Sequence, residues 1–389
     1  MWFFKSPEIV FGEEALEYLD QLKGRRAFIV TDTTMNKLGH VARVRKQLEA
    51  SGFEVAVYDA VEPDPSIEQV RAGAAVLADF QPDWIVGVGG GSSLDAAKAM
   101  WVLYECPDVD PEGINPIETL GLRRKARFVA IPTTSGTGSE STWYIVLTQS
   151  AERRKLGLGS REAMADVAIV DPSFAMSMPP RVTADTGMDA LTHAVEGFTS
   201  QWHNDFADGL CLKAAQLIFE YLPRAYRDGN DAEARLRMHN AASIAGLGFG
   251  NSLTSAAHGM GHALGGVFHV PHGRAVSLFL PYVVEFCIRG EQGSTRYAEL
   301  ARFLRLPSAN EREAAAALAA AIRKLQSELQ QPRTVAECGI TREAFDRELK
   351  LLVENASNDN ETVTSTRIPT DDEMRRLFEY AFEGKPIDF

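Results

Sequence analysis

Short β-like runs alternate with helical patterns in the first half of this 389-residue chain. Apolar residues fill segments 27–30, 84–88 and 128–131, as expected for buried strands. Between them, segments 41–50 and 67–80 repeat apolar residues every three or four positions, which is typical of helices that connect parallel strands. This alternation predicts βαβ units and a mostly parallel sheet.

The pattern changes after a pair of prolines, Pro179 and Pro180. From Thr183 onward, Ala, Leu, Glu and Arg recur at helical spacing, and no segment alternates apolar and polar residues as a strand would. A chain of this length commonly forms two domains. We therefore expect an α/β domain over residues 1–180 and an all-helical domain over residues 181–389.

Charge and cysteine usage exclude several classes of protein. The 53 acidic and 40 basic residues give a net charge of −13, which would repel nucleic acid and an anionic membrane surface. The four cysteines form no CxxC pair, so neither a disulfide framework nor a thiolate zinc site is indicated. No uncharged apolar stretch approaches the ~18 residues of a membrane span. We expect a cytoplasmic protein with no nucleic-acid or membrane partner.

The segment 87–95 (GVGGGSSLD) follows one predicted strand and opens a helical pattern. Backbone N–H groups at such a helix start can hold a phosphate. Ser92 stands where the usual dinucleotide fingerprint has glycine. A tight turn, with Ser92 as the helix N-cap and Asp95 supporting the first turn, is therefore an equal alternative at this point.

A second loop of small residues, 132–140 (PTTSGTGSE), follows another predicted strand. It has no lysine after its glycines, so it is not a P-loop. Neighbouring parallel strands end at one edge of a sheet, where α/β proteins bind nucleotides, so two such loops favour a Rossmann-like phosphate site. Hydroxyl groups in this loop come from Thr133, Thr134 and Thr137.

Asp32 follows the first predicted strand. A carboxylate at that edge would accept hydrogen bonds from the 2′-hydroxyl of an adenosine ribose and repel a 2′-phosphate, which favours NAD over NADP. A turn or cap aspartate is the alternative, and spacing alone does not exclude it.

Seven of the eight histidines fall between residues 193 and 272, which indicates a metal site. Asp189 and His193 lie four residues apart, on one face of a predicted helix, and His258 and His262 repeat this spacing. His272 follows in a proline-glycine turn. One carboxylate with three imidazoles and no thiolate suits Zn²⁺ or Fe²⁺ better than Mg²⁺ or Ca²⁺, and leaves the choice between the first two open.

The His258 and His262 pair also has the spacing of the zinc-protease motif. Gly259 occupies the position of the general-base glutamate that the protease chemistry requires. The sequence therefore disfavours peptide hydrolysis.

Taken together, these motifs resemble the iron-containing, or group III, alcohol dehydrogenase family. The likeness runs nearly end to end and in order, through 7–12 (PEIVFG), 89–92 (GGGS), 132–140, 186–196 (TGMDALTHAVE), 258–262 (HGMGH) and 271–273 (PHG). It implies a dehydroquinate synthase-like architecture, with an N-terminal dinucleotide-binding domain, a helical metal-binding domain and an active site in the cleft between them. It also implies a homodimer.

The resemblance implies a role for particular residues. Asp189, His193, His258 and His272 would hold a catalytic Fe²⁺ or Zn²⁺, and His262 would stand beside them without ligating. His262 is our candidate for relaying the alcohol proton to solvent, with a structural role as an equal alternative. Asp32 would bind the ribose, and the other dinucleotide contacts would come from Gly89, Gly90, Gly91, Ser92, Thr133, Thr134, Thr137, Thr142 and Lys155.

We expect reversible hydride transfer between NAD and small primary alcohols, diols or their aldehydes, with the metal as Lewis acid. Alternatives are a hydroxy-acid (for example 4-hydroxybutyrate) or glycerol dehydrogenase, a dehydroquinate synthase-like lyase and a non-catalytic metal-binding protein. Three positions depart from the family pattern. Asp64 replaces a common asparagine, residues 365–367 (STR) replace a frequent Asn-Pro-Arg, and Glu361 falls about where some relatives carry a cysteine near the substrate. Trp143, Phe249 and Glu361 are candidates for lining the substrate pocket.

Overall fold

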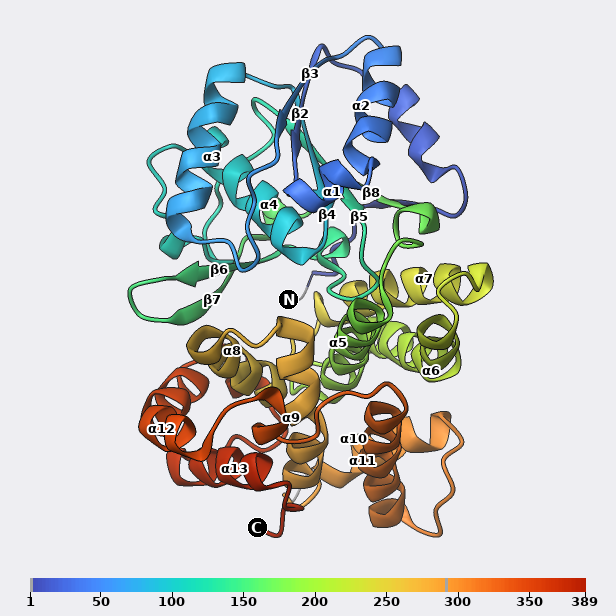
Figure 1. Ribbon diagram of the computed structural model, residues 1–389, viewed down its shortest axis with the longest axis vertical. Helices are drawn as coiled ribbons and strands as arrows, with labels where there is room; N and C mark the ends of the chain where they lie inside the picture. Colours follow the sequence, from blue (N-terminus) through green and yellow to red (C-terminus); the bar gives the residue numbers. More distant parts are fainter. Residues whose placement is uncertain (1–2, 291–292) are drawn as a thin grey trace. The chain divides into compact units, whose positions relative to one another are not determined.

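The computed structural model describes residues 3–290 and 293–389 and divides into two compact units (Figure 1). The first unit extends to Glu152 and resumes over Leu156–Ser177. The second consists of Arg153–Lys155 together with Met178–Phe389. The division after Ser177 lies close to the boundary that Pro179 and Pro180 predict, whereas the short Arg153–Lys155 segment has no counterpart in the sequence pattern.

A six-stranded, fully parallel sheet forms the centre of the first unit. Its buried strands agree with the parallel sheet that the sequence predicts, because a strand covered on both faces is apolar throughout. In spatial order the strands are β1 (Glu8–Phe11), β8 (Val167–Val170), β5 (Arg127–Pro132), β4 (Trp84–Gly89), β2 (Arg26–Val30) and β3 (Glu54–Tyr58).

Helices cover both faces of this sheet. Phe28, Ile85 and Phe128 pack with α3 and α4 on one face, while the alternate residues Ile29 and Val86 pack with α2 on the other. This two-residue alternation builds separate cores on the two sides. The helices are α1 (Thr33–Lys37), α2 (His40–Ala50), α3 (Ile67–Phe80) and α4 (Gly91–Glu105). A separate two-stranded sheet consists of β6 (Tyr144–Gln149) and β7 (Arg154–Gly159).

The second unit is built from helices around one apolar core. The predicted α/β-plus-helical fold is therefore confirmed. Among the described residues, no helix is long and apolar enough to cross a membrane. The helices are α5 (Pro180–Thr199), α6 (Asp205–Arg227), α7 (Ala232–Phe249), α8 (Ala256–Phe268), α9 (His272–Cys287), α10 (Gly293–Phe303), α11 (Glu311–Glu328), α12 (Arg342–Ser357) and α13 (Asp371–Glu383).

Short 3₁₀ segments connect these elements. In the first unit they are η1 (Ala15–Gln21), η2 (Pro111–Gly113), η3 (Ser139–Ser141), η4 (Arg161–Ala163) and η5 (Pro172–Phe174). In the second they are η6 (Ala336–Cys338) and η7 (Thr362–Thr364).

Candidate functional site

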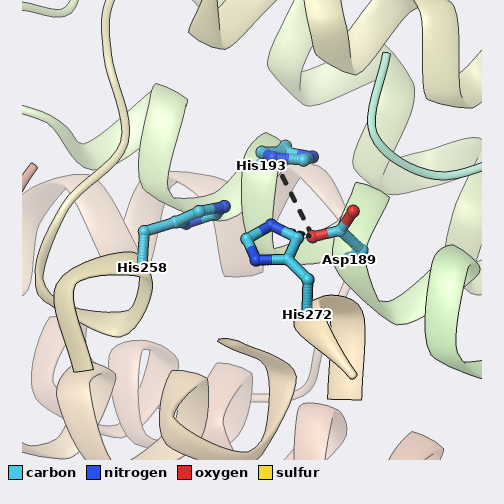
Figure 2. A group of neighbouring side chains, drawn as sticks. All are labelled: Asp189, His193, His258 and His272. Carbon is cyan, nitrogen blue, oxygen red and sulfur yellow. Dashed lines mark ion pairs between the residues drawn. The ribbon is translucent and has the colours of Figure 1, made fainter. Parts of the chain in front are cut away.

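Three helices of the second unit bring one carboxylate and three imidazoles together (Figure 2). Asp189 and His193 lie one turn apart on α5, His258 lies in the first turn of α8, and His272 is the first residue of α9. One ligand atom from each lies within 4.8 Å of all the others. The Oδ1 atom of Asp189 is 3.9 Å from Nε2 of His193 and 3.6 Å from Nε2 of His272. The four side chains singled out by the sequence therefore converge.

The start of α9 is fixed against α5 by close packing and by an ion pair. A Cβ atom on Gly273 would lie 2.3 Å from the carbonyl oxygen of Asp185 and 3.0 Å from Cβ of Asp189, so only glycine fits there without displacement. The Arg274 guanidinium donates to both carboxylate oxygens of Asp185 at 2.8–3.1 Å. These contacts place His272 beside Asp189.

The electrostatics of the cluster fit a divalent cation. Burial raises the pKa of Asp189 to about 8, and burial lowers the pKa values of His258 and His272 well below the usual value for histidine. Among the described residues, Oδ1 of Asp189 and Nε2 of His258 are buried and have no hydrogen-bond partner. A cation with nitrogen and oxygen ligands would satisfy both atoms and favour the ionised carboxylate with neutral imidazoles.

His262 lies beside the cluster and has a carboxylate partner of its own. Its Nδ1 atom is 2.9 Å from Oδ2 of Asp359, and its ring stacks on that of His272 with centroids 5.3 Å apart. Burial lowers the pKa of His262, but the charge and hydrogen bond of Asp359 and the charge of Glu361 raise it, and the net pKa is raised. The predicted relay role of His262 stays a prediction.

The residues suggested for the substrate pocket lie in different surroundings. Phe249 stacks on His193, with ring centroids 4.1 Å apart and planes inclined by 10°. Glu361 is buried and accepts hydrogen bonds from the backbone N–H and the hydroxyl of Thr254. Trp143 belongs to the first unit, where it packs on Tyr144.

The two small-residue loops of the first unit touch each other at the carboxyl ends of β4 and β5. A Cβ atom on Gly90 would lie 3.3 Å from Thr134, and one on Gly91 would lie 2.7 Å from Thr137. This juxtaposition agrees with the expected convergence of the loops. In addition, the hydroxyl oxygen of Thr133 is buried without a hydrogen-bond partner among the described residues.

The loop within segment 87–95 does not have the capping residue that a simple tight turn was expected to have. Helix α4 begins at Gly91, its N-cap is Gly90, and no side chain caps it, so the prediction of Ser92 as N-cap is wrong. Ser92 instead accepts a hydrogen bond from the backbone of Asp64 at 3.3 Å. Because Gly90 and Gly91 have no side chain and nothing caps the helix, the backbone N–H groups at the start of α4 are available to a phosphate.

Asp32 does cap a helix, as its structural alternative predicts. Oδ1 accepts from the backbone N–H groups of Thr34 and Met35 at the start of α1, at 2.8 and 3.1 Å. Oδ2 accepts from the Ser93 hydroxyl at 3.1 Å. Capping leaves the carboxylate negatively charged beside the first loop, so its role at a ribose stays a prediction.

Sequence reasoning missed a buried ion pair behind the second loop. Lys98 and Asp95 lie one turn apart on α4, with Nζ and Oδ1 3.5 Å from each other. Asp95 accepts from Ser139 at 2.6 Å rather than supporting the first turn of its helix, and Lys98 donates to Ser139 at 2.8 Å and reaches Thr142 at 3.4 Å. In the sequence, Asp95 and Lys98 stand three residues apart in a segment that is mostly apolar, and this pattern could have indicated a buried ion pair.

Lys155, expected among the dinucleotide contacts, belongs to the helical unit. It is buried, and its Nζ atom lies 3.4 Å from where a Cβ atom on Gly265 of α8 would be. Its positive charge lowers the pKa values of Asp189 and His272 below what burial and the other groups alone would give. The lysine therefore contributes to the electrostatics of the metal cluster.

Comparison with known proteins finds matches to both units of the chain. Residues 6–172 match the family described as iron-containing alcohol dehydrogenase, and residues 183–382 match the C-terminal part of the same family. The NADPH-dependent butanol dehydrogenase of Clostridium saccharobutylicum is 40% identical over 100% of both chains. The 1-propanol dehydrogenase PduQ of Citrobacter freundii is 35% identical over 97% of this chain and 98% of its own.

A solved structure gives the same result for the fold. The crystal structure of a 1,3-propanediol oxidoreductase superposes with a TM-score of 0.91 at 32% identity, covering 98% of this chain and 100% of the other. The sequence matches and this likeness together extend over both units. The chain therefore belongs to the iron-containing alcohol dehydrogenase family of oxidoreductases.

Proposed function

We propose that the protein catalyses reversible NAD(P)(H)-linked oxidation of small primary alcohols and diols, using Fe²⁺ or Zn²⁺. The observation that carries this proposal is the buried cluster of Asp189, His193, His258 and His272, whose ligand atoms lie within 4.8 Å of one another. The names of the similar proteins, which specify butanol, 1-propanol and 1,3-propanediol, support small alcohols as the substrate class.

Asp189, His193, His258 and His272 would hold a divalent cation, which would supply Lewis-acid chemistry that favours loss of the alcohol proton. Asp189 would balance part of the positive charge, and the three imidazoles would act as neutral ligands. His262 accepts the released proton, and Asp359 stabilises the imidazolium that results. In the first unit, the loops at Gly89–Ser92 and Thr133–Thr137 hold the dinucleotide phosphates through backbone N–H and hydroxyl groups.

We further propose that NAD is preferred to NADP and that the enzyme is a cytoplasmic homodimer. The carboxylate of Asp32, beside the glycine loop, would repel a 2′-phosphate. Similar proteins differ in this choice, since the butanol dehydrogenase is NADPH-dependent and the sulfoacetaldehyde reductase from Bifidobacterium kashiwanohense was solved in complex with NAD⁺. Light scattering on the purified protein tests the dimer.

Metal removal tests the proposed function. Protein dialysed against a chelator should lose alcohol-dependent NADH formation and regain it on addition of Fe²⁺ or Zn²⁺, because ionisation of the alcohol depends on the cation. Following NADH absorbance also separates an alcohol dehydrogenase from a dehydroquinate synthase-like lyase, which consumes no net cofactor. Full activity in a sample shown to be free of metal would contradict the proposal.

Replacing Asp32 with serine tests cofactor choice. Serine can still cap α1 but carries no charge, so the preference for NAD over NADP should fall by about tenfold or more. The ratio of kcat/KM values for the two coenzymes measures this change. Ser93→Ala is the matched control, because it removes a hydrogen bond to Asp32 but keeps the charge. An unchanged ratio in Asp32→Ser would mean that the carboxylate is not at the ribose.

A further inference from the structure

We propose that Glu196 is a positioning residue for the metal centre, whose carboxylate holds His258 in the tautomer that keeps Nε2 unprotonated and able to bind the cation. The inference rests on the proposed metal-dependent function and assigns a task to a residue outside the four ligands. It also links α5, which carries two ligands, to α8, which carries a third.

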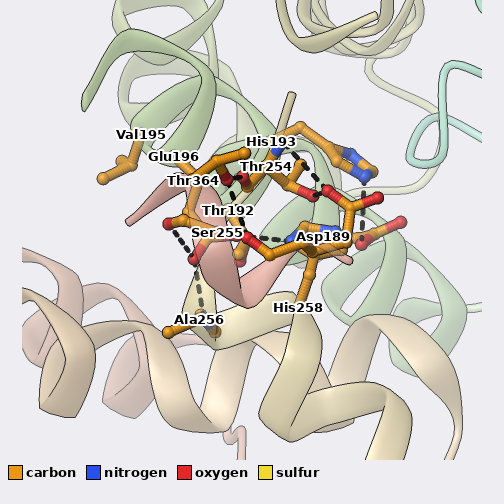
Figure 3. A network of polar contacts seen from close by, with 12 residues as sticks. Asp189, Thr192, His193, Val195, Glu196, Thr254, Ser255, Ala256, His258 and Thr364 are labelled. Carbon is orange, nitrogen blue, oxygen red and sulfur yellow. Dashed lines mark hydrogen bonds and ion pairs between the residues drawn. The ribbon is translucent and has the colours of Figure 1, made fainter. Parts of the chain in front are cut away.

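Glu196 makes three contacts with the beginning of α8 (Figure 3). Its Oε2 atom lies 2.5 Å from Nδ1 of His258. Its Oε1 atom accepts hydrogen bonds from the Ser255 hydroxyl and from the backbone N–H of Ala257, both at 2.7 Å. The side chain is fully enclosed, with 1% of the residue exposed, so water does not compete for these contacts.

Two donors at the start of α8, the Ser255 hydroxyl and the Ala257 backbone N–H, point at the Glu196 carboxylate and oppose the effect of burial, which raises its pKa to about 7. Ser255 is the N-cap of α8, but its side chain does not cap the helix, and Glu196 from α5 accepts these N-terminal hydrogen bonds instead. The positive end of a helix dipole stabilises a negative charge at this place. An ionised carboxylate only accepts hydrogen bonds.

A neutral imidazole carries one N–H group. Because the Glu196 carboxylate requires a donor, that proton belongs on Nδ1 of His258, and Nε2 keeps its lone pair. Nε2 of His258 is buried and has no hydrogen-bond partner among the described residues. In Figure 2 the His258 ring points toward the other three side chains of the cluster. Carboxylate partners of this kind orient metal-bound histidines in other proteins.

The isosteric change Glu196→Gln can place a hydrogen-bond donor, instead of an acceptor, opposite Nδ1 of His258. If the amide oxygen accepts from Ser255 and Ala257, the amide NH₂ faces Nδ1 of His258 and must donate to it. The histidine proton then moves to Nε2, the atom that has to bind the metal. If the amide is turned the other way, its NH₂ faces the N–H donor of Ala257, which cannot accept. The first orientation satisfies all three contacts only with the histidine proton on Nε2, and the second leaves the Ala257 N–H without an acceptor.

Metal affinity measures the consequence. Zn²⁺ titrated against a competing chromophoric chelator should bind Glu196→Gln about 10- to 100-fold more weakly than the unmodified protein. Asp359→Asn is the matched control, because it makes the same change beside Nδ1 of His262, which is not one of the four ligands. The control should keep the affinity of the unmodified protein.

The tautomer itself can be observed without metal. Nitrogen-15 chemical shifts of the histidine rings in the metal-free protein should show His258 protonated on Nδ1, and protonated on Nε2 in Glu196→Gln. The first measurement does not depend on how the variant folds. A proton on Nε2 in the unmodified protein would overturn the inference, as would equal Zn²⁺ affinity of a folded Glu196→Gln. Failure of the unmodified protein to bind Zn²⁺ would instead contradict the proposed function.

Discussion

Replacing His193 with alanine is expected to weaken metal binding strongly and to lower kcat/KM by about a thousandfold or more. The Lewis-acid contribution of a catalytic metal is several kcal/mol, and about 4 kcal/mol corresponds to three orders of magnitude in rate. His193 is buried on α5, one turn from Asp189, and His193→Ala removes one of the four proposed ligands. Metal content by mass spectrometry and steady-state kinetics should fall together.

His203→Ala is the control for this variant. His203 lies in the same unit, but 42% of its side chain is exposed and it is 3.6 Å from Asp208, outside the cluster. Metal content and kcat/KM should stay unchanged in His203→Ala. A His193→Ala variant that keeps one equivalent of metal and normal kcat/KM would remove His193 from the ligand set.

Replacing Lys98 with methionine is expected to lower the free energy of unfolding of the first unit by about 3–5 kcal/mol. The lysine is completely buried, and its loss leaves the buried Asp95 carboxylate without its cationic partner. Burial raises the pKa of Asp95 and lowers the pKa of Lys98, which shows that each charge is unfavourable by itself at this site. Urea unfolding followed by tryptophan fluorescence measures the loss, because Trp101 lies on the same helix.

Two comparisons separate the buried pair from a general effect of losing a charge. Arg45→Met removes the exposed pair with Glu49 on α2 and should cost less than about 1 kcal/mol. The double variant Asp95→Asn/Lys98→Met should be more stable than Lys98→Met alone, since it no longer buries an unpaired carboxylate. A Lys98→Met loss no larger than that of Arg45→Met would contradict this account.

The sequence predicted the central strands better than the edge strands. β4 and β5 are buried on both faces, so their apolar runs stand out. β1 and β3 lie at the two edges of the sheet and are only partly buried, so their shorter or mixed runs resemble loops. The local sequence does not distinguish an edge strand from a loop, because the segment becomes a strand through hydrogen bonds to a neighbouring strand that is distant in the sequence.

Local spacing also predicted the helical faces of the metal site, but not the partners that refine it. Asp189 with His193, and His258 with His262, follow from a four-residue repeat. That repeat does not say which of the last two histidines faces the cluster. The carboxylates that decide their orientation, Glu196 and Asp359, lie 62 and 97 residues away in the chain, so only the tertiary structure reveals them.

Four side chains of the helical unit are proposed to hold one catalytic cation. Crystals of the metal-loaded protein can be measured with X-rays above and below the absorption edge of iron or zinc to locate that cation. We predict one anomalous peak about 2.0–2.3 Å from a ligand atom of each of Asp189, His193, His258 and His272. A loaded crystal with no peak among these residues, or with its metal bound elsewhere, would contradict the account.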